Sequence, residues 1–248
     1  MKTLKIRLDE AYLKTCTAEF IPSDPVQFPR RYKKKQDIEI AAFLAATVAW
    51  GRRDIIIRSC ERMFEKMKNG PYDYVMSGNY SRLGTGCVHR TFSGQDLKYY
   101  CHGLKTCYTA HDDLESLFAS AGNVWAGMVQ FRETVARGNR GVYSIHIADA
   151  GSSSACKRLN LALRWLVREG PVDTGIWKKI PPASLFIPLD VHVGRVARQL
   201  GLLDPERKSN DKKAVLSLTE KLRELCPEDP VKYDFSLFGM GVDANNSD

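Results

Sequence analysis

The segment 37–50, DIEIAAFLAATVAW, is apolar around almost its whole helical circumference. A helix with no polar face needs cover on every side, so the segment predicts a buried central helix. Asp37 is expected to cap its start and Gly51 to end it. The longest apolar run, 40–50, is far below the roughly 18 residues that a membrane-spanning helix needs. We therefore expect a helical core built around this segment and no membrane insertion.

Helical spacing of apolar residues recurs along the rest of the chain. Alternation of apolar and polar residues between turn residues is sparse, so few strands or none are expected. The predicted fold class is all-α. The expected helices cover residues 1–16, 37–50, 54–68, 95–110, 112–118, 152–168, 190–201, 212–225 and 229–239.

The chain of 248 residues has a formal net charge of +8, and part of the excess is local. A basic run within residues 30–35 suits a polyphosphate partner, because each neutralised phosphate releases counterions. The alternative interpretation is a solvated basic loop. Seven cysteines without a CxxC pair favour reduced thiols and no metal site. The N-terminal residues carry charges throughout and lack an apolar signal core, so a cytoplasmic protein is expected.

Lys157 lies in the first turn of a helix for which Ser153 or Ser154 is the expected N-cap. The partial positive charge of a helix N-terminus and the adjacent Arg158 disfavour a protonated ammonium. Both effects favour an amine nucleophile at Lys157. The alternative is a surface lysine that extends from a helix end into solvent.

Asp190 follows Pro188 and Leu189 and precedes an amphipathic helix. Aspartate is a preferred N-cap, so a purely structural role is one interpretation. A carboxylate that accepts backbone N–H bonds also stays ionised, which suits it to orient an amine or stabilise positive charge at a sugar carbon.

Taken together, these motifs resemble the core of the helix-hairpin-helix-GPD superfamily of DNA glycosylases. The order is a helix led by lysine, a proline loop, and the segment PLDVHVGRVARQLGL at 188–202. The segment 38–54 is similar to the early helix of endonuclease III relatives, and the whole match spans about residues 37–240. The separation of 33 residues between Lys157 and Asp190 is closest to the archaeal 8-oxoguanine glycosylase branch. The chain is also similar to a bacterial family described only as a domain of unknown function.

The resemblance implies a helical fold of two lobes with the cleft between them, one lobe formed by 37–168 and the other by 1–36 with 169–248. It implies a base-excision repair glycosylase and AP lyase that acts on double-stranded DNA containing a damaged base, with 8-oxoguanine favoured. The damaged nucleotide would be flipped into the cleft. Lys157 would attack C1′ and form a Schiff base, and Asp190 would activate it. No cofactor or metal is expected, the enzyme would be a monomer, and in a bacterium it would associate with the nucleoid.

The resemblance also implies the remaining site residues. Trp50 and Trp165, with Trp177, are candidates for stacking on an extruded base, although large aromatic residues more often belong to the core. Asp234 falls where a final helix reaches the base pocket; the alternative is an aspartate on the helix surface. Candidates for phosphate contacts, whose alternative is solvated charge, are Arg52, Arg53, Gly151, Ser153, Ser154, Arg158, His192, Arg195 and the basic run.

The chain departs from the family pattern in two places. The glycine-rich hairpin is replaced by DAGSSSACK at 149–157, which has one glycine, and the loop of four iron–sulfur cysteines is missing. Two other functions therefore stay open. One is a nucleic-acid-binding protein that retains the fold without catalysis. The other is a serine acylase in which Lys157 is the base for Ser154 of an S-x-x-K motif, but the partner motifs, a secretion signal and a predicted sheet are missing.

Overall fold

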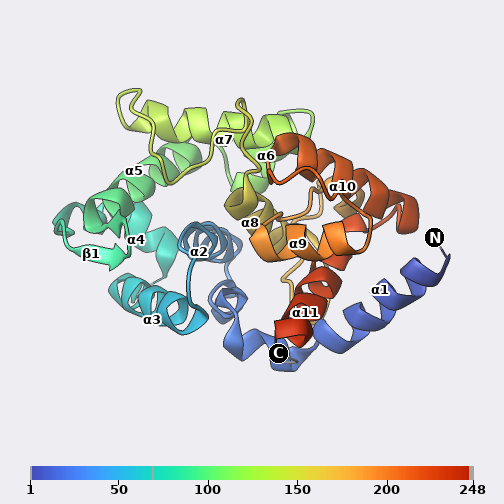
Figure 1. The fold of residues 1–248 in the computed structure, drawn as a ribbon. Helices are drawn as coiled ribbons and strands as arrows, with labels where there is room; N and C mark the ends of the chain where they lie inside the picture. The colour runs from blue at the N-terminus through green and yellow to red at the C-terminus, as the bar shows by residue number, and fades with distance from the viewer. Residues whose placement is uncertain (1, 69, 246–248) are drawn as a thin grey trace. The chain divides into compact units, whose positions relative to one another are not determined.

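The structure, a computed structural model, describes residues 2–68 and 70–245. The predicted all-α class is confirmed, because helices make up most of the described chain (Figure 1). The only strands in these ranges are β1 (Cys87–His89) and β2 (Phe92–Ser93), a short antiparallel pair with an irregularity between Cys87 and His89. The α-helices are α1 (Lys2–Thr15), α2 (Lys35–Thr47), α3 (Arg53–Phe64), α4 (Pro71–Ser77), α5 (Gly94–Ala110), α6 (Leu114–Ser120), α7 (Val124–Gly138), α8 (Lys157–Val167), α9 (Val191–Gln199), α10 (Lys212–Leu225) and α11 (Tyr233–Asn245).

Short 3-10 helices join several of these elements. They are η1 (Ala18–Ser23), η2 (Pro25–Gln27), η3 (Pro29–Arg31), η4 (Glu65–Met67), η5 (Asn79–Arg82), η6 (Pro182–Ser184) and η7 (Pro230–Lys232). Five of them have proline at a first position or inside, which fits the fixed φ of proline and its missing N–H donor. None of the helices in the described ranges combines the length and the apolar character that a bilayer-spanning segment needs.

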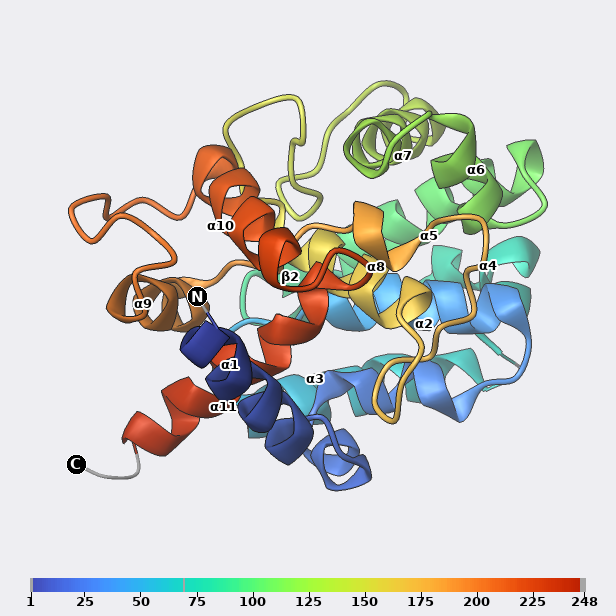
Figure 2. The same ribbon diagram turned by 90° about the vertical axis from the view of Figure 1, so that its right-hand side faces the viewer.

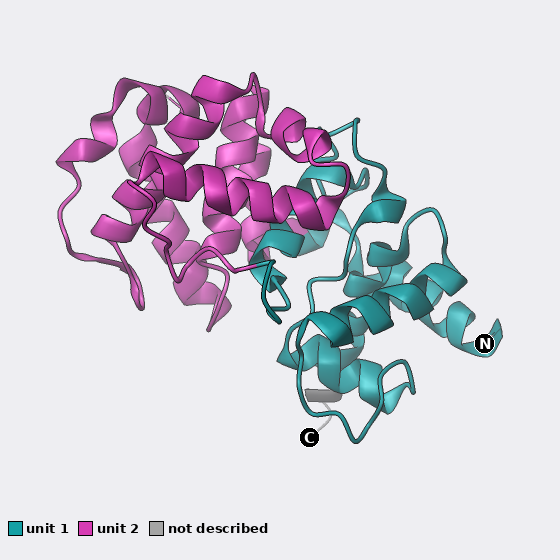
Figure 3. Ribbon diagram, turned by 90° about the horizontal axis from the view of Figure 1, so that it is seen from above, with its two compact units in different colours: residues 1–20, 150–248 teal, residues 21–149 magenta. Residues whose placement is uncertain are grey.

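The chain forms two compact units, coloured separately in Figure 3. Unit 1 contains residues 1–20 and 150–248, and unit 2 contains residues 21–149. These bounds differ from the predicted lobes, which placed α8 with the earlier helices. Ion pairs explain the difference, because Arg164 and Arg168 at the end of α8 pair with carboxylates of the C-terminal segment.

Unit 2 is built around α2, as its apolar sequence predicts. Every residue from Asp37 to Thr47 is buried. Phe43 stacks on Phe131 of α7, with ring centroids 4.7 Å apart, and also contacts Phe118 of α6. The expected cap is wrong: α2 begins at Lys35, and Asp37 lies inside it. An oxygen of Asp37 instead accepts the backbone N–H of Tyr72 at 2.7 Å, which fastens α4 to α2.

Unit 1 is organised around α11, which packs against α1 and α9 (Figure 2). Phe235 of α11 makes edge contacts with the rings of Tyr12 and Phe20. The hydroxyl of Ser236 donates to the backbone oxygen of Leu8 at 2.7 Å. These contacts tie the first helix of the chain to the last one.

Candidate active site

Lys157 and Asp190 meet in unit 1. Lys157 Nζ lies 3.1 Å from Asp190 Oδ2, and about a third and a quarter of the two side chains remain exposed. The two residues are far apart in the sequence, yet each stands at a helix start: Lys157 is the first residue of α8, and Asp190 directly precedes α9. The fold therefore presents an amine and a carboxylate together at a position that solvent reaches.

The two carboxylate oxygens of Asp190 make different contacts. Oδ1 accepts the backbone N–H of Val193 at 2.8 Å, so Asp190 is the N-cap of α9, as its position in the sequence suggests. Oδ2 faces Lys157. The backbone oxygen of Asp190 also accepts the side-chain N–H of Asn210 at 2.9 Å. These bonds fix the carboxylate and leave one oxygen directed at the amine.

The start of α8 differs from the prediction. The expected N-cap, Ser153 or Ser154, is wrong, because the helix begins at Lys157 and Cys156 precedes it in the left-handed conformation, with φ of 49°. Ser154 Oγ accepts the N–H of Cys156, and Ser152 Oγ accepts the N–H of Ser154, both at 3.2 Å. These local bonds favour turns over helix, so the serines delay the helix by about one turn.

The same contacts bear on the serine acylase alternative. The Ser154 hydroxyl receives a backbone N–H, and Lys157 Nζ pairs with Asp190. An acylase would need Lys157 to face the Ser154 hydroxyl as its base. The geometry at Lys157 instead favours a lysine and aspartate pair.

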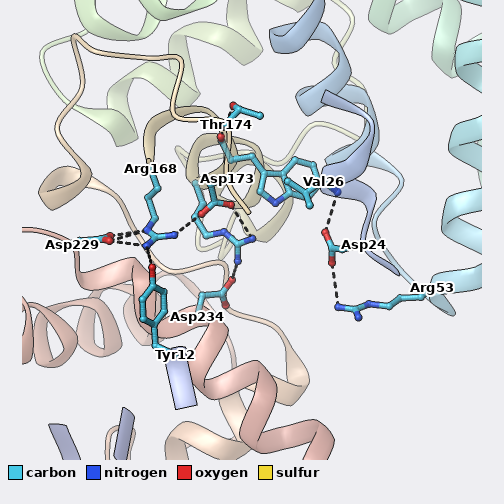
Figure 4. A network of polar contacts seen from close by, with 11 residues as sticks. Tyr12, Asp24, Val26, Arg53, Arg168, Asp173, Thr174, Asp229 and Asp234 are labelled. Carbon is cyan, nitrogen blue, oxygen red and sulfur yellow. Dashed lines mark hydrogen bonds and ion pairs between the residues drawn. The ribbon is translucent and has the colours of Figure 1, made fainter. Parts of the chain in front are cut away.

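A buried ionic network lies along α8 beyond Lys157. Arg164 pairs with Asp234 and, at 3.3 Å, with Asp173. Arg168 pairs with Asp173 and makes a bidentate contact with Asp229, with Nε to Oδ1 at 2.8 Å and Nη2 to Oδ2 at 2.7 Å. Figure 4 shows this alternation of charges running from Asp229 to Asp234. Both arginines and Asp173 are almost fully buried, so the network anchors the helix that carries Lys157.

Asp234 connects this network to the Lys157–Asp190 pair. It is buried, so the surface interpretation of this residue is wrong. Burial raises the pKa of Asp234, the charge of Asp190 acts in the same direction, and Arg164 and Lys157 act against them; the result is a pKa of about 6 in place of the ordinary 3.8. The pKa of Asp234 therefore depends on both members of the candidate pair.

Asp234→Asn is expected to change how stability depends on pH. Because the folded pKa lies above the unfolded one, the folded wild type binds more protons between about pH 4 and 6. Protonation of Asp234 therefore adds up to about 3 kcal/mol to the free energy of unfolding. This contribution is complete below pH 4 and is lost as the pH rises through 6. The melting temperature of wild type relative to Asp234→Asn should rise as the pH falls from 7 to 5. Parallel melting curves for the two proteins over this range would contradict the assignment.

The predicted phosphate contacts of unit 1 lie on loops and helix ends. Gly151 and Ser153 are exposed in a turn that α10 holds, since Lys212 donates its backbone N–H to Ser153 O at 2.8 Å and its ammonium to Ala150 O. His192 and Arg195 are exposed one turn apart on α9, and Arg158 is half-buried beside Lys157. Residues 139–156, which precede α8, contain turns and no α-helix. Unit 1 thus carries several of the predicted cations and donors together with the pair.

Two of the tryptophans predicted for base stacking are core residues. Trp165 of α8 and Trp177 are almost completely buried, so neither presents a ring face to a ligand. Trp50, in unit 2, is half-buried. Its ring lies edge-on to His89, with centroids 4.6 Å apart, and nearly parallel to His146 at 6.1 Å. Of the three, only Trp50 keeps an accessible side chain.

Several of the cations of unit 2 that were predicted to contact phosphates pair with nearby carboxylates. Arg52 directly precedes α3 and pairs with Asp54 in the first turn of that helix, and Arg53 pairs with Asp24 at 3.2 Å (Figure 4). Within the basic run, Arg31, Lys34 and Lys35 also have carboxylate partners. The run therefore fastens the start of α2, and these side chains are less available to phosphates than their sequence suggests.

Sequence reasoning missed Arg164, Arg168 and their partners Asp173 and Asp229. A signal was present, because Lys157, Arg164 and Arg168 are separated by seven and four residues and so share one helix face. Charged residues on a helix face that borders the apolar core indicate buried ion pairs. The carboxylate partners lie in irregular segments, where no periodicity marks them.

Other site types find less support in the structure. Among residues 2–68 and 70–245, no group of three or more His, Cys, Asp or Glu side chains is placed to hold a metal ion. A surface hollow of about 240 Å³ lies in unit 2, bounded by residues that include Lys66, Lys68 and Asp73. It contains none of the predicted site residues.

Comparisons with known proteins identify the family. Residues 24–243 match the model of the family described as "Protein of unknown function (DUF2400)", so the chain belongs to this family. No curated protein and no solved structure matches the chain.

Proposed function

We propose that this member of the DUF2400 family is a DNA glycosylase with AP lyase activity that excises an oxidised purine, with 8-oxoguanine favoured, through a Schiff base on Lys157. The observation that carries the proposal is the distance of 3.1 Å between Lys157 Nζ and a carboxylate oxygen of Asp190. A carboxylate beside a lysine ammonium can accept one of its protons, and it also fixes the orientation of the amine. The two-lobed helix-hairpin-helix architecture and duplex DNA as the substrate are parts of the same proposal.

The proposed chemistry begins with the transfer of an Nζ proton to Asp190. The free amine of Lys157 then attacks C1′, and the electron pair of the glycosidic bond leaves with the damaged base. The protonated Asp190 can return its proton to the departing base. A second Nζ proton then passes to the ring oxygen O4′ as the C1′–O4′ bond breaks, which leaves a protonated imine on Lys157. Removal of a C2′ proton next to this imine expels the 3′ phosphate with the electron pair of its bond to C3′, and this β-elimination is the lyase step.

Support from the surroundings of the pair is electrostatic. The first-turn N–H groups of α8 receive no side-chain cap from Cys156. Such groups and the half-exposed cations near them attract phosphate oxygens. The buried network of Arg164 and Arg168 fixes the orientation of α8. A nucleophile on a rigid element can be held within the narrow geometry that attack at C1′ needs.

Incubation with four duplexes tests the proposal. They carry 8-oxoguanine, an abasic site, uracil or thymine glycol, and both base release and strand cleavage are measured. We expect release and cleavage with 8-oxoguanine and cleavage at the abasic site. Duplex binding without release or cleavage on any of the four would overturn the glycosylase proposal in favour of a non-catalytic DNA-binding protein.

Asp190→Asn separates the two roles of Asp190. Asparagine caps helices as well as aspartate does, so the free energy of unfolding should change by less than about 1 kcal/mol. The proton acceptor for Lys157 is lost, so the rate of cleavage at an abasic site should fall about 10²- to 10⁴-fold. Asp190→Ala is the matched control, because it also removes the cap and should cost about 1 kcal/mol of stability. An Asp190→Asn enzyme with the wild-type rate would exclude this role.

A further inference from the structure

The loop formed by residues 139–149, which follows α7 in unit 2, exposes apolar side chains. Val142 is 62%, Tyr143 51% and Ile145 85% exposed. Single exposed apolar residues are ordinary on a protein surface, but three within four positions are unusual. These three side chains therefore form one exposed apolar group on the loop.

The loop is held at both ends, so its exposed residues are presented on a fixed support. Tyr99 donates its hydroxyl to Val142 O at 2.6 Å, and the side chain of Asn139 bonds to Tyr99 O at 3.0 Å. On the other side of the tip, Ile147 is buried, and Arg132 donates to its backbone oxygen at 3.3 Å. A frayed loop would lack these bonds.

Three arginines lie in the loop or in α7 before it, and one of them, Arg132, pairs with Asp149 at 3.5 Å. The guanidinium of Arg132 lies over the ring of Tyr143, 4.2 Å from its centroid. Arg137 and Arg140 are exposed just before the tip, and Arg140 adopts φ of 58°, which is uncommon for a residue with a side chain. Arginine is preferred where phosphate oxygens are bound in pairs and where guanidinium planes stack on rings.

The loop also adjoins the half-buried Trp50. His146 at its C-terminal side stacks on the Trp50 ring at 6.1 Å and lies 3.7 Å from Asp96. The Arg90 guanidinium lies against Gly51. A Cβ atom at position 51 would be 2.5 Å from Arg90 Nη1. The surface of unit 2 thus combines aliphatic side chains, aromatic rings and arginines around one loop.

We infer that the loop 139–149 is a wedge that places Val142, Tyr143 and Ile145 against the bases of an unstacked step in duplex DNA, while Arg140 and the neighbouring Arg137 contact the flanking phosphates. This inference rests on the proposed function, because it supplies the step that a glycosylase needs before excision. Apolar side chains inserted between base steps replace lost stacking, and base contact with aromatic rings tolerates any sequence. The arginines favour DNA over an uncharged protein surface.

The test measures binding without chemistry. The double variant Val142→Gln/Ile145→Gln is compared with wild type and with Ile6→Gln/Leu13→Gln, which removes exposed apolar side chains from α1. Each protein is titrated at one fixed salt concentration into a duplex that carries tetrahydrofuran, an uncleavable abasic analogue, beside 2-aminopurine, and into the intact duplex. We expect wild type and the α1 control to prefer the tetrahydrofuran duplex and to raise 2-aminopurine fluorescence. The loop variant should lose this preference by about 10-fold or more.

The outcomes separate the wedge from catalysis. Equal affinity and fluorescence for the loop variant and wild type, or no wild-type preference for the tetrahydrofuran duplex, would overturn the wedge, whether or not the protein excises a base. A preference that depends on the loop supports the wedge even if no lesion is released. Cosedimentation with vesicles of phosphatidylserine and phosphatidylcholine provides a third arm. If the loop variant loses vesicle binding but binds DNA as wild type does, the wedge is overturned in favour of a membrane contact.

Discussion

Arg168→Met should lower the free energy of unfolding by about 3–5 kcal/mol, because it removes one partner from a buried set of ion pairs. Arg168 is 1% exposed and contacts Asp173, Asp229 and the Tyr12 hydroxyl. Burial acts to lower the pKa of Arg168, but Asp229 and Asp173 outweigh it, so the pKa lies above its ordinary value. Methionine has a similar length but no charge, so both carboxylates would lose their main counterion.

Urea unfolding at pH 7 measures this effect, with Lys178→Met as the matched control. Lys178 pairs with Glu169 in the same unit, but both side chains are mostly exposed, so the control should change stability by less than about 1 kcal/mol. A loss below 1 kcal/mol for Arg168→Met as well would mean that the network does not hold α8 in place. Contacts other than these ion pairs would then position Lys157.

Lys157→Ala should lower the rate of strand cleavage at an abasic site by at least about 10³-fold, because the lyase step has no other nucleophile in this proposal. The pair with Asp190 is partly exposed, so stability should fall by less than about 1 kcal/mol. The loss of activity would then reflect chemistry and not unfolding.

Lys213→Ala is the control for this variant. Lys213 is exposed in the first turn of α10, as Lys157 is partly exposed in the first turn of α8, and both residues lie in unit 1. Its replacement should leave the cleavage rate within a few-fold of wild type. Equal losses for Lys157→Ala and Lys213→Ala would indicate that any lysine at such a helix start supports binding, and that Lys157 has no special role.

The helices with strong apolar periodicity could be predicted from the sequence. The burial of residues 37–47 followed from their composition, and α10 has the predicted bounds. Helix starts were less predictable wherever a polar side chain had two possible partners. Asp37 bonds to the N–H of Tyr72, and Ser152 and Ser154 form turns, so neither region begins its helix where the capping rule suggests.

Some features of the candidate site could likewise be predicted from the sequence, and others could not. The contact between Lys157 and Asp190 follows the order of motifs in the chain, and Asp190 caps α9 as its sequence suggests. Burial of Asp234 and the partners of Arg168 could not be predicted, because they depend on how α11 and the segment 169–176 pack against α8. The full burial of Trp165 likewise depends on tertiary packing, since one apolar helix face gives no measure of how completely it is covered.

Borohydride trapping tests whether Lys157 forms a covalent imine with DNA. The protein would be incubated with the 8-oxoguanine and abasic duplexes in the presence of sodium borohydride, and the adduct digested and sequenced by mass spectrometry. We expect a reduced adduct on the peptide that contains Lys157, and no adduct with Lys157→Ala. An adduct on another lysine, or none from a folded protein that binds both duplexes, would contradict it.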